Sequence, residues 1–90
     1  MLDIYRRAVS YFGATKQKLK AIEEMAELIV ELVKDLLGDG DPVKVIEELA
    51  DVENMTVQLR IIYDEDGMVD YWKQAKMNRL AHRMEGDAKC

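Results

Sequence analysis

The segment from Pro42 to Tyr63 constrains the fold most, because as a helix it is apolar almost all the way round. At about 100° per residue, one side carries Val45, Leu49, Val52, Met55, Leu59 and Ile62, and another carries Ile46, Ala50, Val57 and Ile61. Such a helix is usually central. A chain of 90 residues buries only about 60% of its unfolded surface, so this segment indicates burial by a second subunit.

The N-terminal half of the chain predicts two helices. The first covers residues 2–12, with apolar residues at helical spacing, and ends near Gly13. The second begins with Thr15 as its N-cap and reaches Leu37. The glycine-rich stretch 38–40 then breaks the helical pattern.

The C-terminal half also predicts two helices. Asp41 is a predicted N-cap, and Pro42 suits the first position of the third helix. The polar stretch 64–67 separates the third and fourth helices, although its acidic residues could instead open the fourth helix, which runs to about Glu85 before Gly86. Short connections between long helices predict an all-α antiparallel bundle of about four helices, completed by oligomerisation.

Composition and charge narrow the class of protein. Residues 1–90 are expected to form a single domain without an internal disulfide, since Cys90 is the only cysteine. The net charge of −5 argues against a nucleic acid polymer as partner. No apolar run is long enough for a membrane span or resembles a signal peptide, so a cytoplasmic location is the expectation.

The second predicted helix carries a dense acidic cluster, made by Glu23, Glu24, Glu27 and Glu31. Three of these residues stack at intervals of four, where each pair of like charges costs a few tenths of a kcal/mol. One interpretation is a solvated face softened by Lys20 and Lys34. The other is a cation site.

The third predicted helix favours the cation site, because Glu48 and Asp51 interrupt its apolar stripe. Buried carboxylates are usually paired or bound to metal, so a buried salt bridge is the alternative. Glu24 and Glu27 share the i, i+3 spacing of Glu48 and Asp51, and two facing helices would bring all four together. All-oxygen ligands suit Mg²⁺ or Mn²⁺. His82 lies far along the chain from both pairs and is interpreted as a surface or packing residue.

The fourth predicted helix places Trp72, Lys76, Arg79 and Arg83 on one face. A solvated basic face near the helix C-terminus is one interpretation. Beside a metal and carboxylate site, the cations could instead hold a transferring phosphoryl group, and the indole ring could stack on a base.

These motifs resemble the MazG-like all-alpha NTP pyrophosphohydrolases, which share an EExxE motif followed by ExxD on the next helix. The chain has Glu-Glu-Met-Ala-Glu at residues 23–27 and Glu-Leu-Ala-Asp at residues 48–51. The similarity covers roughly residues 15–80 in organisation. Lys76-Met77-Asn78-Arg79 occupies the place of a basic motif that family members often have in the final helix.

The resemblance implies an antiparallel helical fold that assembles as a homodimer or homotetramer, with the site near the subunit interface. It implies Mg²⁺-dependent cleavage between the α- and β-phosphates of a nucleotide. Its metal ligands would be Glu24, Glu27, Glu48 and Asp51. Glu23 would orient the attacking water, while the basic motif, including Asn78, and Trp72 would bind the substrate.

Two other functions are compatible with the same residues. Phosphoribosyl-ATP pyrophosphohydrolases share the acidic helices, but they often have a glycine just before the paired glutamates, where this chain has Ile22. A non-catalytic interaction module would use the apolar faces for dimerisation and the carboxylates for salt bridges.

Overall fold

The computed structural model describes residues 2–64 and 66–88. This part of the chain forms four α-helices and no strand: α1 (Leu2–Phe12), α2 (Ala14–Leu36), α3 (Pro42–Tyr63) and α4 (Met68–Ala88). The predicted all-α class is confirmed. None of the described helices combines the length and the apolar character that crossing a membrane requires. Glu65, predicted in a polar break, and Cys90 lie outside the described residues.

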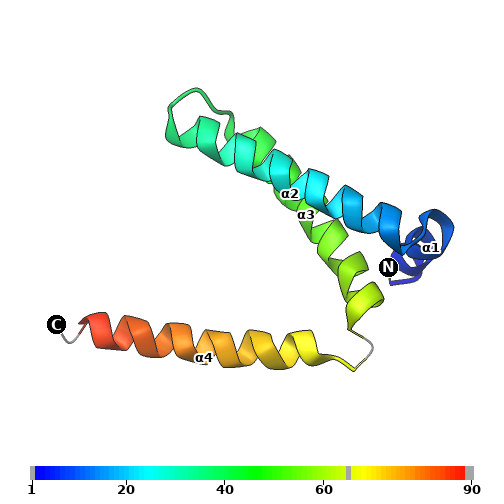
Figure 1. The fold of residues 1–90 in the computed structure, drawn as a ribbon. Coiled ribbons are helices and arrows are strands. Elements are labelled where there is room, and N and C mark those ends of the chain that lie inside the picture. The colour runs from blue at the N-terminus through cyan, green and yellow to red at the C-terminus, as the bar shows by residue number, and fades with distance from the viewer. Residues whose placement is uncertain (1, 65, 89–90) are drawn as a thin grey trace.

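Helices α2 and α3 form an antiparallel hairpin joined by residues 37–41 (Figure 1). As predicted, Asp41 caps α3: its Oδ1 accepts a hydrogen bond from the Val43 N–H at 3.0 Å, and Pro42 is the first helical residue. Gly40 closes tightly against the end of α2, where an added Cβ would lie 2.5 Å from the Asp35 nitrogen. The connection therefore requires glycine at this position.

Two predicted helix boundaries are wrong. Thr15 is not the N-cap of α2, because Gly13 takes that position with a φ of 90° and the helix begins directly after it. Gly86 does not end α4, which continues to Ala88. A single glycine costs only about 1 kcal/mol in a helix, so neighbouring residues with high helix propensity can carry the helix through it.

Helix α3 ends at Tyr63 and α4 begins at Met68, as the predicted polar break requires, and Asp64 also caps the start of α4. Asp64 accepts hydrogen bonds from the backbone N–H groups of Met68 at 2.6 Å and Val69 at 2.9 Å. A carboxylate at this position satisfies N–H groups that have no partner within the helix and interacts favourably with its dipole.

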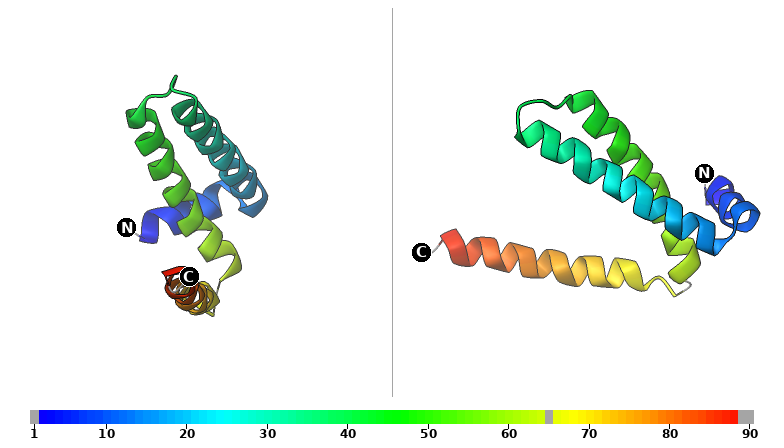
Figure 2. Two further views of the ribbon diagram at one scale, coloured as in Figure 1. Left: turned by 90° about the vertical axis from the view of Figure 1, so that its left-hand side faces the viewer. Right: turned by 45° about the horizontal axis from the view of Figure 1, so that its top comes forward.

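The other two helices differ in how closely they join the hairpin. Helix α1 crosses its open end (Figure 2) and packs on both α2 and α3, with the Tyr5 hydroxyl donating to Asn54 Oδ1 at 2.6 Å. Helix α4 runs as a separate arm and makes no extensive contact with the other described helices (Figure 1). An ion pair between Arg60 and Asp70 at 3.0 Å lies near its start. The expected bundle is thus incomplete within one chain.

The side of α2 that faces α3 carries polar residues and one alanine. Among the described residues, Ala21 and Met55 are the only apolar residues that are buried, at 2% and 5% exposure. The residues of α2 that α3 covers are Gln17, Ala21 and Glu24. Another side of α2 carries Ile22, Ile29 and Leu36, which are 64%, 61% and 86% exposed. No other described part of the chain covers these apolar residues of α2.

Candidate metal centre

The α2–α3 hairpin brings together the four predicted ligands. Carboxylate oxygens of Glu24, Glu48 and Asp51 all lie within 4.8 Å of one another. Glu24 also belongs to a second such group with Glu23 and Glu27. Glu24 is therefore the centre of an acidic cluster that extends over both helices, which we call the carboxylate cluster (Glu23, Glu24, Glu27, Glu48 and Asp51).

The register of the hairpin explains why these residues meet. Gln17 and Glu24 are seven residues apart on α2, and Asp51 and Gln58 are seven apart on α3, so each pair lies on one helix face. In an antiparallel hairpin, Gln17 then meets Gln58 while Glu24 meets Asp51. The Gln17 amide does donate to Gln58 Oε1, at 2.6 Å. The amide pair and the carboxylate cluster therefore share one register of the hairpin.

Two oxygens of the carboxylate cluster are buried and have no hydrogen-bond partner within the described chain, Glu24 Oε2 and Glu48 Oε2. The other oxygen of Glu24 accepts from Lys20 Nζ at 3.1 Å. Lys34 pairs with Glu31 at 3.5 Å, so both predicted softening lysines do contact acidic residues. A buried carboxylate oxygen without a partner costs on the order of 1–3 kcal/mol, which a bound cation would offset.

The alternative of a buried salt bridge on α3 is not observed. Among the described residues, neither Glu48 nor Asp51 pairs with a Lys, Arg or His side chain. Desolvation raises the pKa of Glu48, and the charges of Glu27, Asp51 and Glu24 raise it further. Desolvation and the charge of Glu24 raise the pKa of Asp51, against a lowering by Lys20. Like charges in partial burial resist ionisation together.

These shifts predict how pH affects the metal-free protein. The folded chain holds protons on Glu48 and Asp51 more tightly than the unfolded chain, where their ordinary pKa values are 4.5 and 3.8. The stability that the two groups contribute is complete below those values and is lost as pH rises through the raised values. We therefore expect a Glu48→Gln/Asp51→Asn variant to gain stability over the wild type as pH rises.

Thermal melting in a chelator from about pH 4 to about pH 8 measures this difference. Comparison with the double variant separates the two groups from every other titrating residue. A wild-type melting temperature that runs parallel to that of the variant over this range would contradict the pKa shifts.

The predicted substrate residues lie away from the carboxylate cluster in the single chain. Trp72 and Lys76 line a hollow beside the start of α4. Asn78 accepts from the Gln74 amide at 3.0 Å, and Arg79 is exposed. Within the described residues, no hydrogen bond or ion pair joins α4 to the carboxylate cluster, so one chain does not bring the two parts of the predicted site together.

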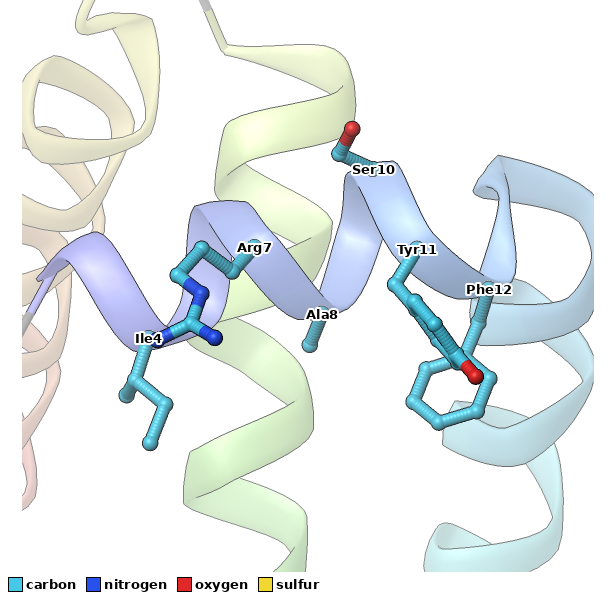
Figure 3. Close-up of a pocket in the computed structure, with 6 residues that line it drawn as sticks. All are labelled: Ile4, Arg7, Ala8, Ser10, Tyr11 and Phe12. Carbon is cyan, nitrogen blue, oxygen red and sulfur yellow. The ribbon is translucent and has the colours of Figure 1, made fainter.

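A hollow of about 490 Å³ on α1 is not a comparable site (Figure 3). Figure 3 shows Ile4, Arg7, Tyr11 and Phe12 extending to one side of the helix, while Ser10 points away. The hollow is lined by this single helix, with Tyr11 83% exposed. A small-molecule site needs convergent groups from several directions, which this surface lacks.

The sequence analysis missed the amides of Gln17 and Gln58, which are buried beside the carboxylate cluster. Their signal was the interval of seven residues from Glu24 and Asp51, which places each amide on the face of an acidic residue.

The centre thus offers several oxygen ligands, two of them desolvated, in a hairpin that holds their positions. This donor set fits a hard divalent cation, which takes oxygen ligands at about 2.0–2.6 Å. Comparison of the chain with protein-family models, curated proteins and solved structures found no match.

Proposed function

We propose that the chain is a Mg²⁺-dependent nucleotide pyrophosphohydrolase that cleaves the α–β phosphoanhydride bond of a (d)NTP to the monophosphate and pyrophosphate. The observation that supports this most is the convergence of Glu24, Glu48 and Asp51 with two buried oxygens that lack a partner. Mn²⁺ suits the same ligands and is the alternative metal.

Each acidic residue has a stated role in this proposal. Glu24, Glu27, Glu48 and Asp51 would hold the ion, which when bound neutralises phosphate charge and lowers the pKa of a water molecule. Glu23 lies at the exposed edge of the carboxylate cluster and would take the proton of the attacking water on a carboxylate oxygen. The water oxygen bonds to phosphorus as the P–O bond to pyrophosphate breaks.

The proposed enzyme is a homodimer or homotetramer. The exposed side of α2 has apolar residues at alternating intervals of three and four, Ile22, Met25, Ile29, Leu32 and Leu36, which we call the α2 seam. This interval is the signature of helices that pack side by side along their length. A second copy that covers the α2 seam would complete the bundle. Lys76 and Arg79 of that copy would then supply the cations for the phosphates.

Pyrophosphate release across a panel of nucleotides with Mg²⁺ tests the activity. Release from one or more (d)NTPs is the expected result. Inclusion of phosphoribosyl-ATP separates the related pyrophosphohydrolase activity, because that enzyme would act on this compound and leave the (d)NTPs intact. Absence of release from every compound in the panel would overturn the proposal.

Mg²⁺ should also raise the melting temperature, because an ion that binds only the folded state stabilises it by mass action. At 100 times the dissociation constant the gain is about 2.7 kcal/mol, or roughly 10–20 °C for a domain of this size. NaCl at equal ionic strength is the control for charge screening. A non-catalytic interaction module predicts the same melting temperature in both salts, and that result would favour it.

A further inference from the structure

A pocket of about 540 Å³ opens next to the carboxylate cluster, between α1, α2 and α3. Phe12 and Leu19 form apolar walls, and Met55, Gln17 and Gln58 lie at its buried side. Lys20 and Glu23, at the border of the carboxylate cluster, also line it. The pocket and the carboxylate cluster are therefore adjoining parts of one surface.

In the polar part of the pocket, the direction of each hydrogen bond is fixed, because one partner can only accept. The Asn54 carbonyl can only accept, and it takes a hydrogen bond from Gln58 Nε2 at 3.2 Å. Gln58 Oε1 therefore faces Gln17 and accepts from its Nε2 at 2.6 Å. Within the described residues, the Gln17 side chain makes this hydrogen bond through its Nε2. Its Oε1 remains as an acceptor, on a residue that is only 7% exposed.

Such a pocket suits a flat ligand with one apolar face and an N–H edge. Phe12 is 50% exposed, and its ring meets the Tyr11 ring edge to face, with the centroids 4.9 Å apart. An aromatic ring at this place offers a face for stacking, which every nucleobase can use. Side-chain amides pair with the edges of bases, because both offer donors and acceptors in a plane. Gln17 and Glu24 are two helical turns apart on α2, about 10 Å, so the base and phosphates of one molecule can reach both.

We propose that this pocket binds the base of the nucleotide, stacked on Phe12 and donating an N–H to Gln17 Oε1. The inference rests on the proposed function, because it places the substrate of that reaction. It assigns base recognition to α1 and to the amide pair, and phosphate chemistry to the carboxylate cluster.

Phe12→Ala tests the stacking wall. It should lower kcat/KM for the preferred nucleotide by about 5- to 150-fold, mainly through KM. Ile4→Ala is the control, because Ile4 is an exposed apolar residue of the same helix that does not line this pocket. Inorganic tripolyphosphate, which has no base, should inhibit the wild type and both variants with the same inhibition constant.

A Gln17→Met/Gln58→Met variant tests the amide pair. Replacing both partners of a hydrogen bond with apolar groups of similar shape can leave folding almost unchanged, which a melting curve checks. The ratio of kcat/KM between the best and the worst base should fall by up to about tenfold. Should this variant not fold, Phe12→Ala alone decides.

The outcomes separate the two proposals. If the wild type releases pyrophosphate but Phe12→Ala matches Ile4→Ala in KM, the pocket does not bind the base, and the proposed function stands. A fall in tripolyphosphate inhibition equal to the loss of nucleotide binding would also overturn the pocket. If the wild type hydrolyses no nucleotide, both proposals fail.

Discussion

Glu48→Gln and Asp51→Asn are each expected to lower Mg²⁺-dependent pyrophosphate release by about 100-fold or more in kcat/KM. Even a group that only supports a ligand is worth about 10- to 100-fold in metal affinity or activity, and these residues would bind the ion directly. Both substitutions keep the shape of the side chain and remove the charge. The loss should be partly recovered at higher Mg²⁺ concentration, since the remaining ligands still bind the ion.

The adjacent variant Glu47→Gln is the matched control, because Glu47 is exposed on the same helix and belongs to neither acidic group. It should retain wild-type activity. The Glu48→Gln and Asp51→Asn variants should also melt at or above the wild-type temperature in a chelator, because the repulsion that raises both pKa values is relieved. Folded variants that hydrolyse nucleotides at the wild-type rate would show that Glu48 and Asp51 do not form the site of hydrolysis.

Ile29→Lys is expected to convert the protein from an oligomer to a monomer. Ile29 lies in the middle of the α2 seam and is 61% exposed in the single chain. Burying one such side chain on association contributes roughly 1.5–3 kcal/mol, and a symmetric dimer contains two. The loss weakens dimerisation by about 10²- to 10⁴-fold before the cost of a desolvated ammonium group is counted.

Sedimentation at several protein concentrations measures the change. Asp35→Lys is the control, because Asp35 is exposed on α2 and lies outside the α2 seam. The control should sediment as the wild type does. Wild-type melting temperature should rise with protein concentration, whereas that of Ile29→Lys should not. A wild type that sediments as a monomer at all concentrations would overturn the proposed assembly.

The helices could be predicted well because their signals are local. Asp41 and Pro42 mark the start of α3 by chemistry that needs no tertiary contact. Thr15 and Gly86 were misjudged for the opposite reason. A glycine with positive φ already ended α1 and began α2, and a helix interior tolerates one glycine when its neighbours favour the helix.

The arrangement of the helices was harder to predict than their existence. The pattern of α2 shows an apolar and an acidic side, and burial of the apolar side would be the usual expectation. Instead α3 covers the side with Ala21 and Glu24. Periodicity identifies the two sides of a helix but does not say which neighbour each one meets.

The carboxylates could be predicted because Glu48 and Asp51 break an apolar stripe, which is a visible anomaly in the sequence. The Gln17–Gln58 pair could not be recognised in the same way, because a neutral amide is common on any helix surface. The basic residues of α4 stay an open prediction. Their helix does not reach the carboxylate cluster in one chain, and a sequence does not record contacts between copies.

The inward polar side of α2 has a consequence for the order of folding. Contacts within the α2–α3 hairpin join segments close in sequence, and such local structure forms in microseconds to milliseconds. Only two apolar residues are buried among the described residues, so the hairpin alone has little stability. If the α2 seam is covered by a second copy, the encounter of two chains becomes the slow step. Refolding would then follow second-order kinetics. At lower protein concentration the α2 seam of each chain would stay exposed to solvent for longer before association.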